Sequence, residues 1–209
     1  TRSFVSMSSI KKRSKKSFSL ENFHTFIKEH GVLGFFDEPI TLKSGQLSTW
    51  YVNWRSVSND AYLLEELAEF VIQFVEDNEI PVNTFYGVPE GASKLGIITQ
   101  FLWAKAADTY AKGSDRLAMG RAKPKEHGAP ADRFFIGEPV GKVIILEDVT
   151  TTGGSLLRTV DMLKEQGVDI SAALCLTERA NPEEHDALIQ AMQDRGVKYE
   201  ALSYAKDLI

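Results

Sequence analysis

The feature that most constrains the fold is a regular alternation of short apolar segments with longer amphipathic ones, which begins near residue 84. The apolar segments have the length of buried strands, and the amphipathic ones have the spacing of helices. Strands that alternate with helices of this length form a parallel sheet covered by helices on both faces. The sequence therefore predicts an α/β fold. The predicted strands are 84–88, 142–146, 170–176 and 198–204, with a weaker candidate at 117–119, and the predicted helices among them are 91–107, 155–166 and 182–194.

The first third of the chain departs from this alternation. Ser19 can cap a helix that runs to His30. Residues 35–57 read as two strand-like segments around a turn at Thr41–Gln46. A second helix with one apolar face begins at Asp60. These elements predict a small hood that precedes the alternating core.

Domain organisation follows from length and composition. The chain has 209 residues, of which 43% are hydrophobic, enough for one sizeable domain. Residues 1–17 form a Ser-rich leader with basic residues at 11–16 and no apolar period, and we expect this leader to be disordered. We expect residues 18–209 to be one domain, with the hood at about 18–57 and the core at about 58–209.

Composition also argues against several classes of protein. The single cysteine, Cys175, lies in an apolar run, which indicates a buried, inert thiol in a reducing compartment. No stretch approaches the apolar length of a transmembrane helix. A net charge of −5 does not favour a general nucleic-acid binder. We therefore expect a cytoplasmic protein that binds neither membrane nor nucleic acid.

The most informative segment follows the strongest predicted strand. Two adjacent acids, Glu147 and Asp148, end the strand, and a turn rich in Thr, Gly and Ser leads into a helix. At the carboxyl edge of a parallel sheet, such a turn directs backbone N–H groups toward a phosphate. The acids would repel a lone phosphate, but they can accept hydrogen bonds from the hydroxyls of a sugar. The motif thus indicates a sugar phosphate; the alternative is an ordinary strand–turn–helix with a capping Thr.

This segment resembles the signature of type I phosphoribosyltransferases, which bind 5-phosphoribosyl 1-diphosphate (PRPP). The resemblance implies that the turn holds the 5-phosphate. It also implies that Glu147 and Asp148 bind the ribose hydroxyls and favour the positive charge that develops on the ring. The implied turn residues are Thr150, Thr151, Thr152, Gly153, Gly154 and Ser155.

Two further segments resemble orotate phosphoribosyltransferases in particular. Thr41–Val52 is similar to the motif that begins their hood, and Arg179 stands where they carry an arginine that faces orotate. A guanidinium can meet the orotate carboxylate with two parallel hydrogen bonds. The resemblance implies that Tyr51, Val52, Thr151 and Arg179 line the base site, and that Lys43 contacts PRPP and its pyrophosphate. Taken singly, Lys43 could be a turn residue and Arg179 a surface residue.

Residues 121–128 resemble the mobile catalytic loop of the same enzymes. Its basic side chains can stabilise the negative charge of the departing pyrophosphate, and a closing loop excludes water. The loop could instead be a solvated charge run. The implied contacts to PRPP are Arg121 and Lys123, with Lys125 and His127 as catalytic groups.

The chain departs from the family pattern in the segment that should form the pyrophosphate turn. Glu90 and Gly91 stand where many relatives carry an aromatic residue and a lysine. Lys94 could compensate, or it could be an ordinary lysine on a helix surface.

The resemblance implies an enzyme that converts orotate and PRPP to orotidine 5-phosphate and pyrophosphate. Mg²⁺ would be carried by the pyrophosphate, because no carboxylate cage is visible in the sequence. It also implies a homodimer in which loop 121–138 reaches the neighbouring subunit. Two alternatives stay open: a phosphoribosyltransferase for another base, and a PRPP-sensing regulator that binds nucleic acid.

Overall fold

The centre of the fold is a parallel sheet of four strands. The computed structural model describes residues 13–42 and 45–209. The strands lie in the order β3–β4–β5–β6, and every neighbouring pair is parallel. This confirms the predicted α/β fold with a parallel sheet. The strand bounds are β3 (Thr84–Gly87), β4 (Lys142–Thr150), β5 (Asp169–Glu178) and β6 (Lys198–Ala201).

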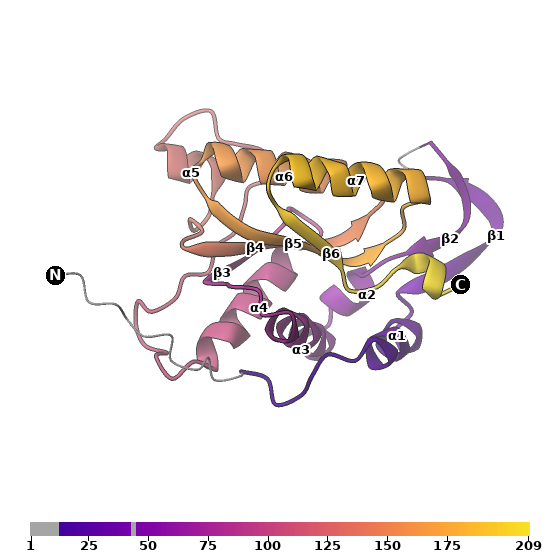
Figure 1. The fold of residues 1–209 in the computed structure, drawn as a ribbon, viewed down its shortest axis with the longest axis horizontal. Helices are drawn as coiled ribbons and strands as arrows, with labels where there is room; N and C mark the ends of the chain where they lie inside the picture. Colours follow the sequence, from indigo (N-terminus) through magenta and orange to yellow (C-terminus); the bar gives the residue numbers. More distant parts are fainter. Residues whose placement is uncertain (1–12, 43–44) are drawn as a thin grey trace.

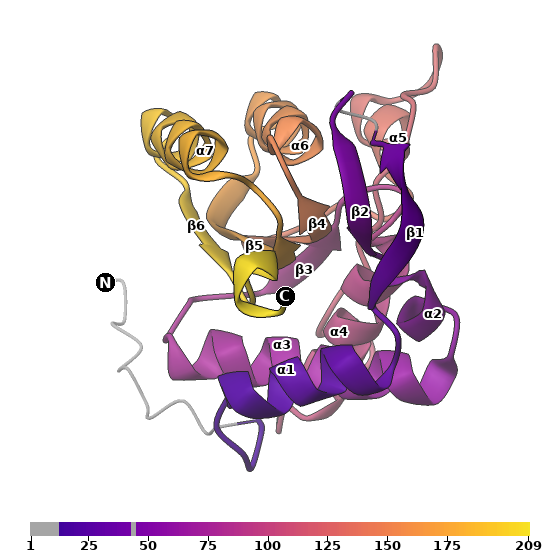
Figure 2. The ribbon, with the colours of Figure 1, turned by 90° about the vertical axis from the view of Figure 1, so that its right-hand side faces the viewer.

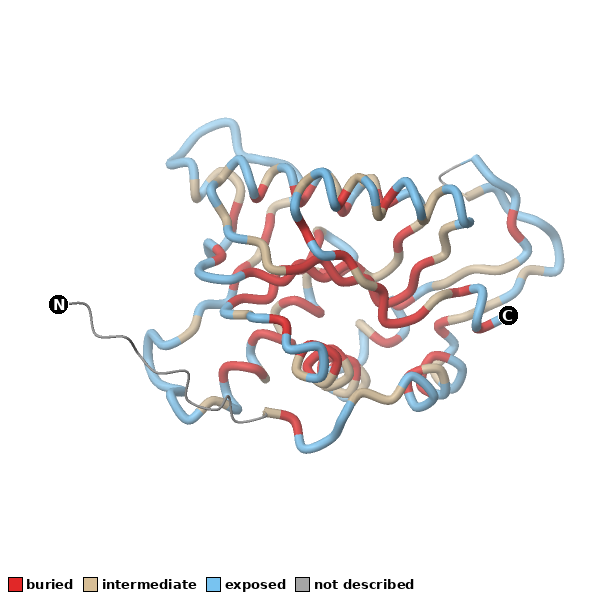
Figure 3. The backbone as a smooth tube through the Cα atoms, in the orientation of Figure 1, coloured by how far each residue is buried: buried red, intermediate tan, exposed pale blue. Residues whose placement is uncertain are grey.

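Helices cover both faces of this sheet (Figure 1). One face carries α1 (Leu20–Glu29), α3 (Ala61–Asp77) and α4 (Ser93–Lys105), and the other carries α6 (Gly154–Glu165) and α7 (Pro182–Asp194). Side chains that alternate along β4 fill two separate cores. In Figure 3 the strands form a buried layer between the helices.

The predicted hood is an antiparallel hairpin. It consists of β1 (Leu33–Thr41) and β2 (Leu47–Val52), followed by the short helix α2 (Arg55–Ser58). Figure 2 shows the hairpin rising beside α6 at the end of the sheet where the parallel strands finish. The hairpin therefore lies near the turns that follow β3, β4 and β5.

The described end of the basic leader contacts α3 and α4. The backbone N–H groups of Arg13 and Ser14 donate to the carboxylate of Glu76. The guanidinium of Arg13 lies 3.7 Å from the centre of the Trp103 ring, and the Phe18 ring packs against Phe74. These contacts tie residues 13–18 to the helical face of the domain.

The segment between α4 and β4 differs from the prediction. Leu117–Met119 forms no strand, and a single bridge between Gly120 and Phe135 closes the base of the loop instead. The predicted loop 121–138 contains a short helix, α5 (Pro130–Phe134). The 117–119 segment is too short to pair along its length, so its polar backbone is satisfied by loop contacts such as Met119 N–H to Gly137 O.

The end of the last strand also differs from the prediction. β6 ends at Ala201 rather than at Tyr204, and a 3₁₀ turn, η1 (Ala205–Asp207), follows it.

Within the described ranges, no helix has both the length and the apolar character needed to span a bilayer.

Candidate functional site

The turn after β4 has the form of an anion-binding site. Gly153 is the N-cap residue of α6, and no side chain caps this helix. The amides of its first turn are therefore open to an external acceptor. Gly153 has φ +78°, and a Cβ there would lie 2.4 Å from Cδ1 of Leu188, so the turn requires glycine. Thr151 is half-buried beside it, while Thr152 and Ser155 are exposed.

The acid pair lies immediately before this turn. Glu147 is only 6% exposed, and burial together with the neighbouring Asp148 raises its pKa from 4.5 to about 9. The backbone N–H of Asp148 donates to Oε1 of Glu147 over 3.1 Å. At neutral pH Glu147 therefore keeps a proton that it can donate.

A second turn, residues 88–92, meets the acid pair from β3. A Cβ on Gly91 would lie 2.8 Å from Oδ2 of Asp148, so the two turns approach closely. The peptide bond between Pro89 and Glu90 is cis. Nζ of Lys94 donates to Oδ1 of Asn59 over 2.8 Å, which directs this lysine toward the α2–α3 connection. Lys94 thus does not compensate for the lysine absent from this turn.

Arg179 joins the end of β5 to the hood. Its backbone N–H donates to the carbonyl of Thr150 over 2.8 Å, which fixes it beside the end of β4. Its Nη2 donates to Oγ of Ser48 over 3.1 Å, and its guanidinium lies 4.1 Å from the centre of the Trp50 ring. Burial lowers the pKa of Arg179, with Glu184 acting in the opposite direction. The predicted base-site arginine is therefore held against β2 by neutral groups.

The other predicted hood residues lie on the same hairpin. The Tyr51 ring packs over Gly34, where a Cβ would lie 2.0 Å from Cζ, and against Phe36 at 4.9 Å between ring centres. Val52 packs against the core on the α3 side of the sheet. Lys43 lies outside the described residues.

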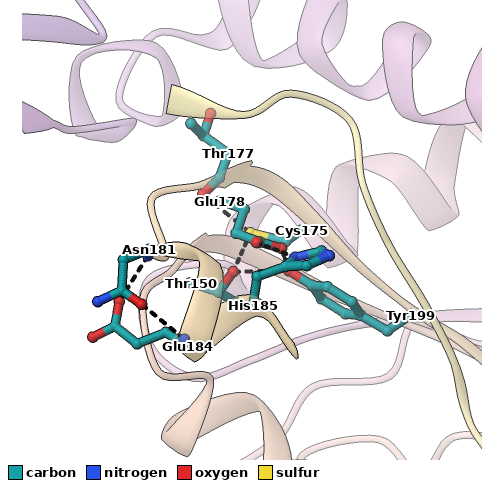
Figure 4. Close-up of polar contacts among 8 residues, drawn as sticks. All are labelled: Thr150, Cys175, Thr177, Glu178, Asn181, Glu184, His185 and Tyr199. Atoms are coloured by element: carbon teal, nitrogen blue, oxygen red, sulfur yellow. Dashed lines mark hydrogen bonds and ion pairs between the residues drawn. The ribbon is translucent and has the colours of Figure 1, made fainter. Parts of the chain in front are cut away.

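Thr150 occupies a different position from the one predicted. It is 3% exposed, and its hydroxyl lies 2.9 Å from the hydroxyl of Tyr199 and donates to Sγ of Cys175 over 3.3 Å. The Thr150 side chain therefore points into the interior, toward Cys175 and Tyr199, and supports the turn from below (Figure 4). Cys175 is buried as predicted, and burial raises the pKa of its thiol.

The same buried network includes a histidine without a recognisable sequence motif. Nδ1 of His185 lies 2.6 Å from Oε1 of Glu178, and the Tyr199 hydroxyl donates to Oε2 of Glu178 over 2.7 Å (Figure 4). His185 lies on the helix predicted over residues 182–194, and no motif in the sequence gives it a partner. Its partner comes from a different element, so helical periodicity gives no signal for this contact.

The predicted catalytic loop extends away from the hood. Arg121 is half-buried and Lys123, Lys125 and His127 are exposed. Backbone bonds from Arg121 to Phe134 and from Lys125 to Arg133 hold the loop to its return segment. In Figure 1 the loop beside α5 and the β1–β2 hairpin lie at opposite ends of the molecule. One chain therefore does not bring the predicted loop residues together with Arg179.

Arg158 lies at the turn after β4 and was not among the predicted site residues. Its Nη2 donates to Oγ of Ser155 over 3.3 Å, and its Nη1 lies 3.4 Å from the position of a Cβ on Gly154. The guanidinium thus reaches back over the first turn of α6. The sequence carried one signal for this position. Arg158 follows Ser155 by three residues, so the two side chains lie on the same face of the predicted helix.

Comparisons with known proteins agree with this geometry. No protein-family model matches the chain. The chain is 31% identical over 175 residues to the orotate phosphoribosyltransferase of Rhodopseudomonas palustris strain BisB5, which covers 81% of this chain and 87% of that relative.

Solved structures share the fold. The crystal structure of orotate phosphoribosyltransferase from Francisella tularensis has a TM-score of 0.65 at 21% identity, covering 90% of this chain and 87% of that one. The Mycobacterium tuberculosis orotate phosphoribosyltransferase in complex with PRPP has a TM-score of 0.55 at 17% identity, covering 76% and 82%. Together with the sequence identity across most of both chains, these findings show that the protein belongs to the orotate phosphoribosyltransferase family.

Proposed function

We propose that this protein transfers the ribose 5-phosphate of PRPP to orotate, giving orotidine 5-phosphate and pyrophosphate in pyrimidine biosynthesis. The single observation that carries the proposal is the meeting of three features at one sheet edge. These are the uncapped turn after β4, the acid pair before it, and a guanidinium with no described carboxylate bonded to it. A relative in the same family is solved with PRPP bound.

The turn after β4 would hold the 5-phosphate. Open amides at the start of α6 and the hydroxyls of Thr151, Thr152 and Ser155 supply donors, and Gly153 and Gly154 let the phosphate approach the backbone. Arg158 adds a positive charge at the mouth of the turn. Thr150 is left out of this set, because its hydroxyl is committed to the interior.

The acid pair would bind the ribose and support the developing charge. Protonated Glu147 can donate to a ribose hydroxyl, while ionised Asp148 can accept from one. As the bond from C1 to pyrophosphate lengthens, positive charge grows on the ring, and the Asp148 carboxylate stabilises it. The two acids therefore have different roles that follow from their different exposure.

Arg179 would select orotate among the bases. Nη2 of its guanidinium is bonded to Ser48, and the remaining N–H groups can meet the orotate carboxylate. The predicted wall of the base site is completed by Tyr51 and Val52 on the hairpin and by Thr151, while Lys43 would contact PRPP.

The leaving pyrophosphate would be stabilised by a loop from a second copy of the chain. Arg121, Lys123, Lys125 and His127 lie on the exposed loop that extends away from this chain's own hood. A homodimer in which each loop closes over the neighbouring site would bring these cations to the pyrophosphate and exclude water.

Mg²⁺ would be bound mainly through the diphosphate oxygens of PRPP. In the described ranges no three His, Cys, Asp or Glu side chains gather as a metal site, so substrate oxygens would complete its coordination. Asp148 is the part-exposed carboxylate at this edge that could contact it. The ion would neutralise charge on the departing diphosphate.

We place the enzyme in the cytoplasm.

A turnover assay with Mg-PRPP and a panel of orotate, uracil, hypoxanthine and adenine tests the function. Of the four bases, only orotate should be converted. Conversion of a purine but not of orotate would contradict the proposal. If no base is converted, a PRPP-sensing regulator is favoured instead.

Two arginine variants test the assignment of sites within the enzyme. Arg179→Ala should raise KM for orotate by about 10- to 100-fold through loss of charged hydrogen bonds, with little effect on KM for PRPP. Arg158→Ala is the matched control and should raise KM for PRPP by about fivefold, with little effect on orotate. Equal losses for both substrates in either variant would overturn its placement.

A further inference from the structure

Two carboxylates lie close to Arg179, yet neither is paired with it. Glu178 precedes it in sequence, and Glu184 on the first turn of α7 acts on its pKa through its charge. Among the ion pairs between described residues, none includes Arg179. An arginine beside two acids normally pairs with one of them, so the arrangement needs a cause.

The cause for Glu178 is that both of its oxygens are occupied elsewhere. Oε1 lies 2.6 Å from Nδ1 of His185, and Oε2 accepts from the Tyr199 hydroxyl over 2.7 Å. The Glu178 side chain is 2% exposed, and the Tyr199 hydroxyl is itself 2.9 Å from that of Thr150. Figure 4 shows the Glu178 side chain among these partners.

Glu184 is held in a comparable way. Its Oε2 accepts from the backbone N–H of Asn181 over 2.9 Å, as half of the capping box that begins α7. Its Oε1 accepts from Nε2 of Gln46 over 3.3 Å. Figure 4 shows the Asn181–Glu184 pair separated from the Glu178 cluster. Both acids near Arg179 thus have other partners for each oxygen.

We propose that Tyr199 and His185 are positioning residues that hold the Glu178 carboxylate away from Arg179, and so keep this guanidinium available for the carboxylate of the substrate. The inference rests on the proposed contact between Arg179 and orotate. An internal ion pair would have to break before orotate could bind, and that cost would appear as weaker orotate binding.

Glu178 and Arg179 border the same pocket. They line a cavity of about 520 Å³, together with Trp50, His185 and Tyr204. A Glu178 carboxylate released by Tyr199 and His185 would therefore share this pocket with the guanidinium, where the two charges could pair.

Steady-state kinetics of Tyr199→Phe, His185→Ala and the double variant test this inference. Each single change frees one oxygen of Glu178 and should raise KM for orotate about threefold, and the double variant should raise it about tenfold. KM for PRPP and kcat should stay within about twofold of the wild type. Tyr204→Phe is the matched control, since it removes a phenol hydroxyl from the same pocket and should leave all three constants unchanged.

Rescue separates the proposal from a merely structural role. Adding Glu178→Gln to the double variant removes the competing charge while keeping the side-chain size, and should return KM for orotate to within about twofold of Glu178→Gln alone. If the triple variant stays as impaired as the double variant, or if KM for PRPP rises in parallel, the inference is wrong. If Arg179→Ala leaves KM for orotate unchanged, the proposed function of Arg179 fails instead.

Discussion

Glu147 and Asp148 are adjacent in sequence, but their surroundings differ. Glu147 is buried in β4, whereas Asp148 is only partly buried. Because burial penalises the charged form and the neighbouring carboxylate repels a second charge, the pKa of Glu147 rises to about 9. In the proposed function, the pair would present a donor and an acceptor to two neighbouring sugar hydroxyls.

Glu147→Gln should change how stability depends on pH. The folded protein keeps a proton that the unfolded chain releases above about pH 4.5, since the pKa of Glu147 is raised from 4.5 to about 9. Its contribution to stability is fully present below about pH 4.5 and is lost as the pH rises toward about 9, with a slope of at most about 1.4 kcal/mol per pH unit.

Urea unfolding of both proteins across this range measures the difference. The wild type should lose more stability than the variant between about pH 5 and about pH 9. A wild-type curve parallel to that of Glu147→Gln would mean that Glu147 is ionised in the folded protein.

At the residue scale, the sequence predicts a side chain's position best where local backbone conformation determines it. It predicts that position worst where contacts between separate elements determine it. The Thr-Gly-Ser turn after β4 was predicted, because glycine at a left-handed position and small hydroxyl residues have local causes. The inward direction of Thr150 was not predicted, because it depends on Tyr199, which lies 49 positions away on another strand. The contact between His185 and Glu178 was not predicted either, because the two residues are 7 positions apart on different elements. The role of Arg179 came from family resemblance.

At the scale of elements, α6 is fixed at both ends by glycines whose surroundings differ. Gly153 before the helix and Gly167 after it have φ +78° and +76°. A Cβ on Gly153 would meet Leu188 of α7 at 2.4 Å, while a Cβ on Gly167 would meet nothing within 4 Å. The start of α6 is thus coupled to α7 as well as to the turn.

Comparing Gly153→Ala with Gly167→Ala separates backbone strain from this packing. Gly167→Ala should cost about 1 kcal/mol of unfolding free energy from the left-handed backbone alone. Gly153→Ala should cost about 2–4 kcal/mol, because the clash with Leu188 is added, and it should also raise KM for PRPP. Equal losses in urea unfolding would show that Leu188 moves aside freely.

The elements themselves were largely predictable, and the exceptions have a physical reason. The buried strands and amphipathic helices show clear periodicity. Their succession along the chain and the parallel sheet were therefore predicted. The segment from 117 to 136 has neither period nor apolar run, so its short helix α5 and its single bridge depend on tertiary contacts.

At the scale of the whole molecule, the predicted site residues lie at two ends of the molecule. The acid pair, the turn after β4 and Arg179 lie at the carboxyl edge of the sheet near the hood, while the basic loop extends at the other end (Figure 1). Closing this separation within one chain would require the loop to cross the molecule. The proposed two-fold dimer would bring one subunit's loop to the other's sheet edge without such a movement.

Subunit complementation tests whether the loop acts on a neighbouring subunit. Lys125→Ala should disable the loop, and Asp148→Asn should disable the sheet edge, so each variant alone should be nearly inactive. If the loop acts on the partner, a mixed dimer contains one site with an intact edge and an intact loop. Random exchange gives about half mixed dimers, each with one working site of two, so mixing equal amounts should recover about a quarter of wild-type activity.

Mixing Lys125→Ala with a chain that carries both changes is the control, and it should recover nothing because no intact loop is present. Size-exclusion chromatography with light scattering would establish that the exchanged species is a dimer. A mixture that stays at the mean activity of its two parents after complete exchange would mean that each loop serves its own chain. In that case Lys125 and Asp148 would have to meet through a rearrangement of the 121–138 segment across the molecule.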